Sequence, residues 1–355
     1  MILNQAPFRL KGRKVLLMAE GEFSALGAKT AVCYLRYRGE DVVAVLDSSK
    51  HGQTAGHVLG FGGEIPIVSS VSEALELDPK VAVVGIAPRG GQLDTTLRKP
   101  ITESIEAGLD VVSGLHTFLA DDVELVEAAK KSGSRFWDVR YVPETKLVAS
   151  GRGCETGAKT VLVTGTDCNV GKMTATVELF HEAERRGMNV SWAATGQTGI
   201  MLRERGLCID RVIADFIGGA AEELVNFEGA GKDLVIVEGQ GSLVHPGYAG
   251  VTLGLMFGVA PDCMVLAHQA GRDHVRRYDD VAMPPVADLV RLHETVMAPV
   301  KKSPVVAVAL NTADLDTASA EDAVSRLRKE TGLPVSDPVR SRGSAILDAI
   351  MESLS

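Results

Sequence analysis

The chain has 355 residues, 45% of them hydrophobic, and a formal net charge of -9. This length allows more than one sizeable core, so we expect two domains. The acidic balance argues against nucleic acid as the main partner, because phosphate backbones attract basic surfaces. No apolar run approaches the roughly 20 residues that cross a bilayer, and the start lacks a signal-peptide pattern. We therefore expect small-molecule substrates, no membrane partner and a cytoplasmic location.

The cysteines indicate neither a disulfide framework nor a zinc site. Their number is odd, and no two of them form a Cys-x-x-Cys spacing. Most are expected to be small core residues, and no metal ligand is assigned from them. They are Cys33, Cys154, Cys168, Cys208 and Cys263.

The first part of the chain alternates short apolar runs with helical patterns, which is typical of a parallel sheet wrapped by helices. The predicted strands are residues 15–19, 42–46, 81–86 and 111–112. The predicted helices between and after them are residues 25–38, 71–77, 95–107 and 122–132. We therefore expect a Rossmann-like α/β domain at residues 1–145.

Residues 141–159 lose this periodicity and are rich in glycine, so they are predicted to be a linker or a loop over a site. The second domain is placed at residues 146–355. Its predicted strands are residues 160–164, 189–194, 233–237, 263–267 and 305–309, and its clearest helices are residues 173–186, 214–225 and 320–331. This pattern again predicts an α/β fold with a mostly parallel sheet.

Residues 165–174 read Gly-Thr-Asp-Cys-Asn-Val-Gly-Lys-Met-Thr, between a predicted buried strand and a helix. Such a turn presents backbone N–H groups and a helix dipole to phosphate, and Lys172 adds a positive charge. The alternative is a tight turn without a ligand. We predict a P-loop NTPase-like domain that binds phosphate through Thr166, Asp167, Cys168, Asn169, Val170, Gly171, Lys172, Met173 and Thr174.

This loop departs from the usual Walker pattern at two points. Five residues separate Gly165 from Gly171, and Met173 stands where a serine or threonine usually binds magnesium. Thr174 comes one position late. The sequence therefore does not favour a magnesium ion held by this loop.

A second motif follows a predicted buried strand, where residues 238–246 read Glu-Gly-Gln-Gly-Ser-Leu-Val-His-Pro. The strand should deliver Glu238 beside the phosphate loop, where a carboxylate can bind a metal or move a proton. The alternative is a solvated carboxylate at a strand end. His245 is either a functional group or a hydrogen-bonding loop residue.

Other polar residues follow strands at the carboxyl edge of the sheet, where open α/β folds bind ligands. Gln197 and Thr198 are candidates to hydrogen-bond a substrate, and Arg272 is either an anion fork or a member of an exposed ion pair. Asp215 interrupts an apolar stretch, so we expect a buried and partnered carboxylate, or else a helix N-cap.

In the first domain, Gly21, residues 27–30 and Asp47 occupy positions that meet a nucleotide in Rossmann sheets. Residues 65–74 and 106–113 also resemble the CoA-binding domain of succinyl-CoA synthetase. That resemblance points to coenzyme A.

The spacing Gly-Thr-Asp-x-x-Val-Gly-Lys and the Glu-Gly-x-Gly motif resemble those of dethiobiotin synthetase. Together with the Rossmann-like half, these two motifs make the chain similar, nearly end to end, to one family. This family was long known as a domain of unknown function and is associated with D-glutamate N-acetyltransferase.

The resemblance implies transfer of an acetyl group from acetyl-CoA to the amine of D-glutamate. The loop would then hold the phosphates of CoA, and magnesium would be dispensable. Glu238 or His245 would be the base, and Lys172 or backbone N–H groups at 239–241 would stabilise the oxyanion. The substrate-binding candidates are Gln197, Thr198, Asp215, Gln240, Gly241 and Arg272.

Two other functions remain open at this point. One is an ATP-dependent ligase or kinase of the dethiobiotin synthetase kind, with Asp167, Thr174 and Glu238 around magnesium. The other is a nucleotide-controlled switch or binding module. Nucleotide hydrolysis would distinguish the first from an acetyltransferase. A homo-oligomer is also expected.

Overall fold

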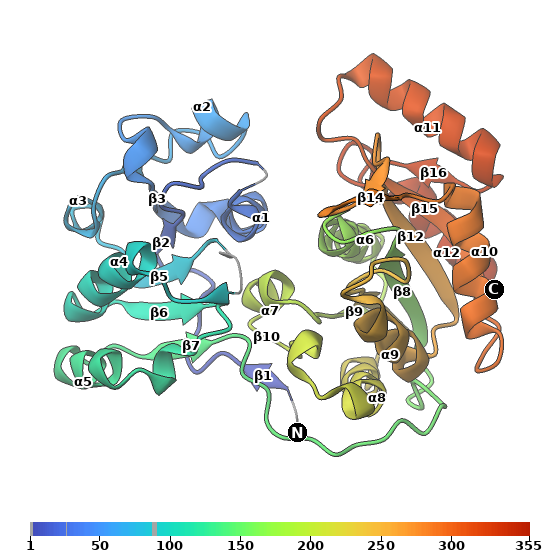
Figure 1. Cartoon of the computed structure of the whole chain (residues 1–355), viewed down its shortest axis with the longest axis horizontal. Coiled ribbons are helices and arrows are strands. Elements are labelled where there is room, and N and C mark those ends of the chain that lie inside the picture. Colours follow the sequence, from blue (N-terminus) through green and yellow to red (C-terminus); the bar gives the residue numbers. More distant parts are fainter. Residues whose placement is uncertain (1–2, 26, 87–90) are drawn as a thin grey trace. The chain divides into compact units, whose positions relative to one another are not determined.

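The computed structural model describes residues 3–25, 27–86 and 91–355, which form two compact units (Figure 1). One unit contains Asn4–Tyr141 and also Ile200–Arg205. The other contains Val142–Gly199 and Gly206–Ser355, together with Leu3. Both units are α/β, as the sequence predicts.

The first unit is built on a parallel sheet with the strand order β4-β3-β2-β5-β6-β7. This order matches the Rossmann arrangement: β3 and β4 lie on one side of β2, and β5, β6 and β7 lie on the other. The strands are β2 (Val15–Met18), β3 (Val42–Leu46), β4 (Ile67–Val68), β5 (Val81–Val84), β6 (Asp110–Ser113) and β7 (Phe136–Asp138). The helices are α1 (Lys29–Arg38), α2 (Ala55–Leu59), α3 (Val71–Leu75), α4 (Thr95–Glu106) and α5 (Val123–Ser132). The short strand β1 (Asn4–Gln5) precedes them.

The sequence predicted the four inner strands of this unit and missed β4 and β7. Both missed strands are short and lie at the edges of the sheet, so their apolar runs are weak signals. The predicted helix at 25–38 was too long, because α1 begins at Lys29 and residues 25, 27 and 28 are not helical. Residue 26 lies outside the described residues.

Asp47, which follows β3, organises the loop after β2. Its buried carboxylate accepts N–H bonds from Gly21 (3.2 Å) and Phe23 (2.9 Å) and from Ser49 (3.0 Å). Burial alone raises the pKa of Asp47, but the hydrogen bonds of Ser49, Phe23 and Lys50 outweigh it and hold that pKa below its usual range. The Asp47 carboxylate therefore holds the loop after β2 against the loop after β3.

The second unit contains a parallel sheet with the strand order β16-β15-β12-β8-β11-β9. The strands are β8 (Lys159–Gly165), β9 (Val190–Ala193), β11 (Leu234–Glu238), β12 (Cys263–Gln269), β15 (Val305–Asn311) and β16 (Val335–Ser336). The five long strands were predicted, and the two-residue edge strand β16 was missed. β13 (His274–Val275) and β14 (Tyr278–Ala282) form an antiparallel hairpin, and the two-residue strand β10 (Arg205–Gly206) pairs with β1.

Helices cover both faces of this sheet (Figure 1). On one side lie α6 (Lys172–Arg185) and α12 (Ser344–Leu354), and on the other lie α8 (Ile217–Gly229), α9 (Ala249–Val259) and α10 (Val286–Met297). The remaining helices are α7 (Gln197–Arg203) and α11 (Thr317–Thr331), which packs beside β16. Because both faces are covered, the strands are almost continuously apolar and buried.

Strand pairing decides which loops meet at the carboxyl edge of this sheet. β8 lies between β12 and β11, and Glu238 pairs in register with Val163, just before the phosphate loop. The loops that follow these three strands therefore lie side by side. In the described part of the chain, no helix is both long enough and apolar enough to span a membrane.

Candidate functional site

The phosphate loop occupies the turn between β8, which ends at Gly165, and α6, which begins at Lys172. Two of its residues adopt left-handed backbone conformations, Asn169 with φ 59° and Gly171 with φ 105°. Glycine tolerates this region without strain, and asparagine tolerates it better than most residues. The turn directs the amino end of a 14-residue helix at the site, which favours an anion there.

Lys172 ties the phosphate loop to the loop after β11. Its side chain passes so close to Gly165 that a Cβ there would lie 2.9 Å from Cδ of the lysine. The ammonium donates hydrogen bonds to the carbonyls of Asp167 (2.7 Å) and Gly241 (2.8 Å). A side chain at position 165 would therefore force Lys172 to shift, and the hydrogen bonds of Lys172 hold its charge between the two loops.

Asp167 is fully buried and organises the cationic side of the site. One carboxylate oxygen accepts the N–H of Cys168 (2.6 Å), and the other accepts the N–H of Arg276 (2.7 Å). The Arg272 guanidinium lies 3.6 Å from that second oxygen. Arg272 therefore forms an ion pair, but with a buried partner in the phosphate loop itself.

Arg276 is a site residue that sequence reasoning missed. Burial lowers its pKa, and the positive charges of Arg277 and Arg272 act in the same direction. A bound anion would relieve this crowding of positive charge. The only sequence signal was the run of basic residues after β12, which has no fixed spacing to the phosphate loop.

His245 is buried within the same group of side chains. Its Nδ1 accepts the N–H of Gly247 (3.1 Å), and its ring stacks on Tyr248 with a centroid distance of 4.5 Å. A neutral imidazole that accepts at Nδ1 carries its proton on Nε2. His245 is therefore an N–H donor in this geometry. Sequence reasoning identified this residue but could not assign its role.

Asp167, Cys168 and His245 place one potential ligand atom each within 4.8 Å of one another. These residue types can bind a metal, but Asp167 already accepts two N–H groups and pairs with Arg272. Met173 points into the core and leaves no hydroxyl at the usual magnesium position. The residues present suit an anion better than magnesium, because Lys172, Arg272 and Arg276 bring more positive charge than the single Asp167 carboxylate offsets.

Glu238 lies at the end of β11 and is 3% exposed. Its Oε2 accepts the N–H groups of Thr195 (3.1 Å) and Gly196 (3.3 Å), and its Oε1 accepts the side-chain amide of Gln240 (3.2 Å). These bonds take three of the roughly four acceptor sites of a carboxylate. The geometry favours a residue that holds the loop after β9 in place; the prediction that Glu238 is the base stays a prediction.

Glycines around Glu238 are needed for close approach. A Cβ on Gly199 would lie 2.3 Å from Oε2 of Glu238, and one on Gly239 would lie 2.3 Å from the carbonyl oxygen of Val163. No real side chain could occupy either position without displacing its neighbours. Gly199 is thus needed beside the Glu238 carboxylate, and Gly239 is needed beside the backbone of β8.

The other predicted substrate-binding residues occupy different surroundings. Gln197 and Thr198 begin helix α7, where the sequence had suggested a loop. Gln240 is tied to Glu238 and to the hydroxyl of Thr195 (3.3 Å). Asp215 lies in a short 3-10 turn before α8 and is exposed, so the expectation of a buried carboxylate is wrong. Its N-cap alternative is also wrong, because no side-chain cap bond is present at the start of α8.

His268, near the end of β12, contacts the phosphate loop at Thr166. Its Nδ1 lies 2.9 Å from the hydroxyl oxygen of Thr166. Burial lowers the pKa of His268 to about 4, so the ring is neutral at pH 7. It therefore contributes a hydrogen bond and no charge.

Comparison with known proteins agrees with this architecture. The P-loop domain described as a domain of unknown function, DUF1611_C, matches residues 147–347, and the accompanying DUF1611_N Rossmann-like domain matches residues 48–142. The chain belongs to the DUF1611 family. This confirms the family resemblance and the fold expected from the sequence.

Relatives of this DUF1611 chain include two curated proteins named D-glutamate N-acetyltransferase. The protein from Pseudoalteromonas sp is 37% identical over 281 residues, which cover 78% of this chain and 83% of the relative. The protein from Tritonibacter scottomollicae is 34% identical over 297 residues, which cover 82% and 87%. The chain is accordingly an enzyme of the acyltransferase class.

The fold is also similar to that of a solved structure. A crystal structure of a DUF1611 family protein from Anabaena variabilis is 39% identical to this chain, with a TM-score of 0.91. The match covers 96% of this chain and all of that protein. This chain therefore shares its fold with that family member along nearly its whole length.

Proposed function

We propose that this DUF1611 enzyme transfers an acetyl group from acetyl-CoA to the amino group of D-glutamate. The amine nitrogen attacks the thioester carbonyl carbon, the carbon–sulfur bond breaks, and CoA leaves as its thiol after the amine has given up a proton. The proposal is supported by the names of two relatives that match across most of the chain.

The observation that supports the role of the phosphate loop is the set of donors gathered around it, which outnumber the one buried carboxylate of Asp167. Lys172, Arg272 and His245 are donors, and the amino end of α6 adds its dipole. Such a site matches the diphosphate of CoA in charge and in hydrogen bonding. It has no need of magnesium to neutralise the phosphates.

The pantetheine arm of CoA places its thioester far from its phosphates. About 13 single bonds join the diphosphate to the thioester, which corresponds to on the order of 15 Å in an extended chain. Groups that touch the phosphates, such as Lys172 and His245, are then too far away to act on an extended acetyl group. We infer that these two residues bind the donor and that Glu238 positions the loop after β9.

The test is an assay of the purified protein with acetyl-CoA and a panel of D- and L-amino acids. Thiol release and the mass of the N-acetylated product are followed together. We expect turnover with D-glutamate, and much less with L-glutamate as the matched control. Magnesium-dependent ATP hydrolysis without acetyl transfer would contradict the proposal and support a ligase or kinase instead.

A further inference from the structure

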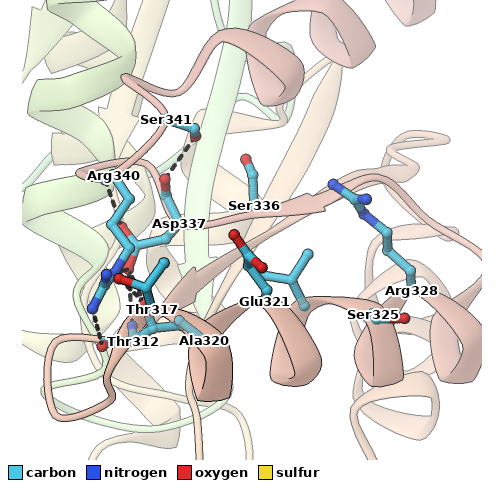
Figure 2. Close-up of a pocket in the computed structure, with 11 residues that line it drawn as sticks. Thr312, Thr317, Ala320, Glu321, Ser325, Arg328, Ser336, Asp337, Arg340 and Ser341 are labelled. Carbon is cyan, nitrogen blue, oxygen red and sulfur yellow. Dashed lines mark hydrogen bonds and ion pairs between the residues drawn. The ribbon is translucent and has the colours of Figure 1, made fainter.

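A second cavity, of about 420 Å³, opens at the carboxyl edge of the P-loop unit (Figure 2). The ends of β15 and β16 form one wall, and α11 forms the other. Thr312 and Arg340 lie at one end, and Arg328 at the other. The volume is within the range of small-molecule sites.

This cavity lies close to the phosphate loop. Asn311 is the last residue of β15, and its Cβ would lie 3.6 Å from a Cβ on Gly171 of the loop. The next residue, Thr312, lines the cavity. The cavity and the loop are therefore neighbours, with Asn311 between them.

The wall beside Thr312 is held by a closed set of hydrogen bonds. The Asp337 carboxylate accepts the N–H of Thr312 (3.0 Å), the hydroxyl of the same residue, and the N–H of Val339 (2.8 Å). Arg340 donates to the Thr312 hydroxyl (3.0 Å) and to the carbonyl of Leu315 (2.6 Å). The cavity is thus preformed, because its polar wall is fixed by the protein alone.

The charges of the cavity differ from those of the loop. Two arginines, Arg328 and Arg340, are balanced by Glu321 and Asp337, so the lining is formally neutral. Figure 2 shows the Glu321 carboxylate reaching from α11 toward β16. Ala320 and Val324 add apolar surface on the same helix. This combination suits a flat, uncharged ring system with donors and acceptors at its edge.

We infer that this cavity is the adenosine subsite of the phosphorylated co-substrate held by the loop. An adenine ring has apolar faces, an exocyclic amine that can donate to Glu321, and ring nitrogens that can accept from Arg328. The choice of acetyl-CoA as that co-substrate rests on the proposed function. The subsite itself rests on the cavity, its neutral lining and its proximity to the loop through Asn311.

The experiment compares acetyl-CoA with S-acetyl-4′-phosphopantetheine, which carries the thioester but lacks the adenosine with its 3′-phosphate and one phosphate of the diphosphate. The effect of adenosine alone is therefore given by the Glu321 variant, measured with both donors. In the parent protein we expect KM for the truncated donor to be at least 10-fold higher. Glu321→Ala should raise KM for acetyl-CoA roughly 10-fold, the loss typical of one charge-assisted hydrogen bond, and leave KM for the truncated donor unchanged. Asp322→Ala is the matched control: this neighbouring exposed acid pairs only with Arg326 among the ion pairs described (3.1 Å) and should change neither value.

Filling the cavity with a large side chain gives a second, independent test of the subsite. Ser325 is exposed on α11 and lines the cavity, so Ser325→Trp should fill it and weaken ADP binding at least 10-fold in calorimetry. Arg326→Trp places the same ring one residue further along the helix and should leave ADP binding intact. Thermal melting of each variant confirms folding.

The outcomes separate the subsite from the proposed function. Equal KM values for the two donors in the parent, or ADP binding unaffected by Ser325→Trp, would overturn the subsite while acetyl transfer stands. Binding of GDP in preference to ADP would overturn the adenosine assignment. No acetyl transfer from either donor, with ADP binding still lost in Ser325→Trp, would support the subsite and reject the acetyltransferase proposal.

Discussion

Replacing Glu238 should destabilise the P-loop unit far more than it slows turnover in the protein that remains folded. The carboxylate accepts the N–H groups of Thr195 and Gly196 and the side-chain amide of Gln240, and it is 3% exposed. In Glu238→Ala these donors lose their acceptor, and because the site is buried, water can hardly take the place of the carboxylate. In Glu238→Gln the amide oxygen can still accept the two backbone N–H groups.

The magnitude follows from those contacts. A buried donor left without a partner costs about 1–3 kcal/mol, so the two backbone donors in Glu238→Ala cost about 2–6 kcal/mol together. The lower half of this range is favoured, because the bond of Gly196 is only partly buried. Glu238→Gln exchanges charge-assisted for neutral hydrogen bonds and should cost about 1–2 kcal/mol.

Urea unfolding followed by tryptophan fluorescence measures these losses. Trp192 is buried on β9, and a Cβ on Gly199 would lie 3.2 Å from its ring, so it reports on the loop that Glu238 holds. Trp137 belongs to the other unit, and a Trp137→Phe background isolates the signal. The chain contains no tryptophan besides these two.

Turnover decides between positioning and base catalysis. We expect kcat of Glu238→Gln, corrected for the folded fraction, to stay within about threefold of the parent value, because the residue only shapes the loop. A general base would instead show a fall of ~10²–10⁴-fold in kcat. Such a fall with an unchanged free energy of unfolding would refute our reasoning and return Glu238 to the reacting centre.

Three further predictions concern the loop and its supports. Lys172→Ala should raise the Kd for CoA by ~10–100-fold, since charged hydrogen bonds typically contribute about 1.5–3 kcal/mol. The KM for D-glutamate should change little. If calorimetry shows an unchanged affinity for CoA, Lys172 does not belong to the phosphate site. Acetyl-CoA should bind equally well with EDTA present, because Met173 offers no metal-binding hydroxyl; loss of binding on chelation would support the ATP-dependent alternative. The free energy of unfolding should fall as pH drops from about 6.5 to 4. In this range His268 is protonated in the unfolded chain but stays neutral in the folded protein, where its pKa is about 4. His268→Gln should therefore reduce the slope of the unfolding free energy against pH by about 1.4 kcal/mol per pH unit.

The amino-acid sequence by itself determined the local features of this protein. The strands of the two sheets that are buried on both faces appear as unbroken apolar runs, and the phosphate loop appears as a fixed spacing between a strand and Lys172. Both signals lie within about ten residues, so neither depends on distant parts of the chain. The placement of Glu238 beside the loop also followed, because parallel strands deliver their carboxyl ends to one edge.

Only the tertiary structure decided which partners these residues meet. Arg276 lies far along the chain from Asp167, and the exposure of Asp215 depends on how its turn packs. The edge strands β4, β7 and β16 exist because a neighbouring strand offers hydrogen bonds to a short segment. The donors around Glu238 likewise come from the loop after β9 and from its own loop, and no spacing in the sequence could show that they meet this carboxylate. Such contacts depend on distance in space, whereas periodicity and spacing record only neighbours in sequence.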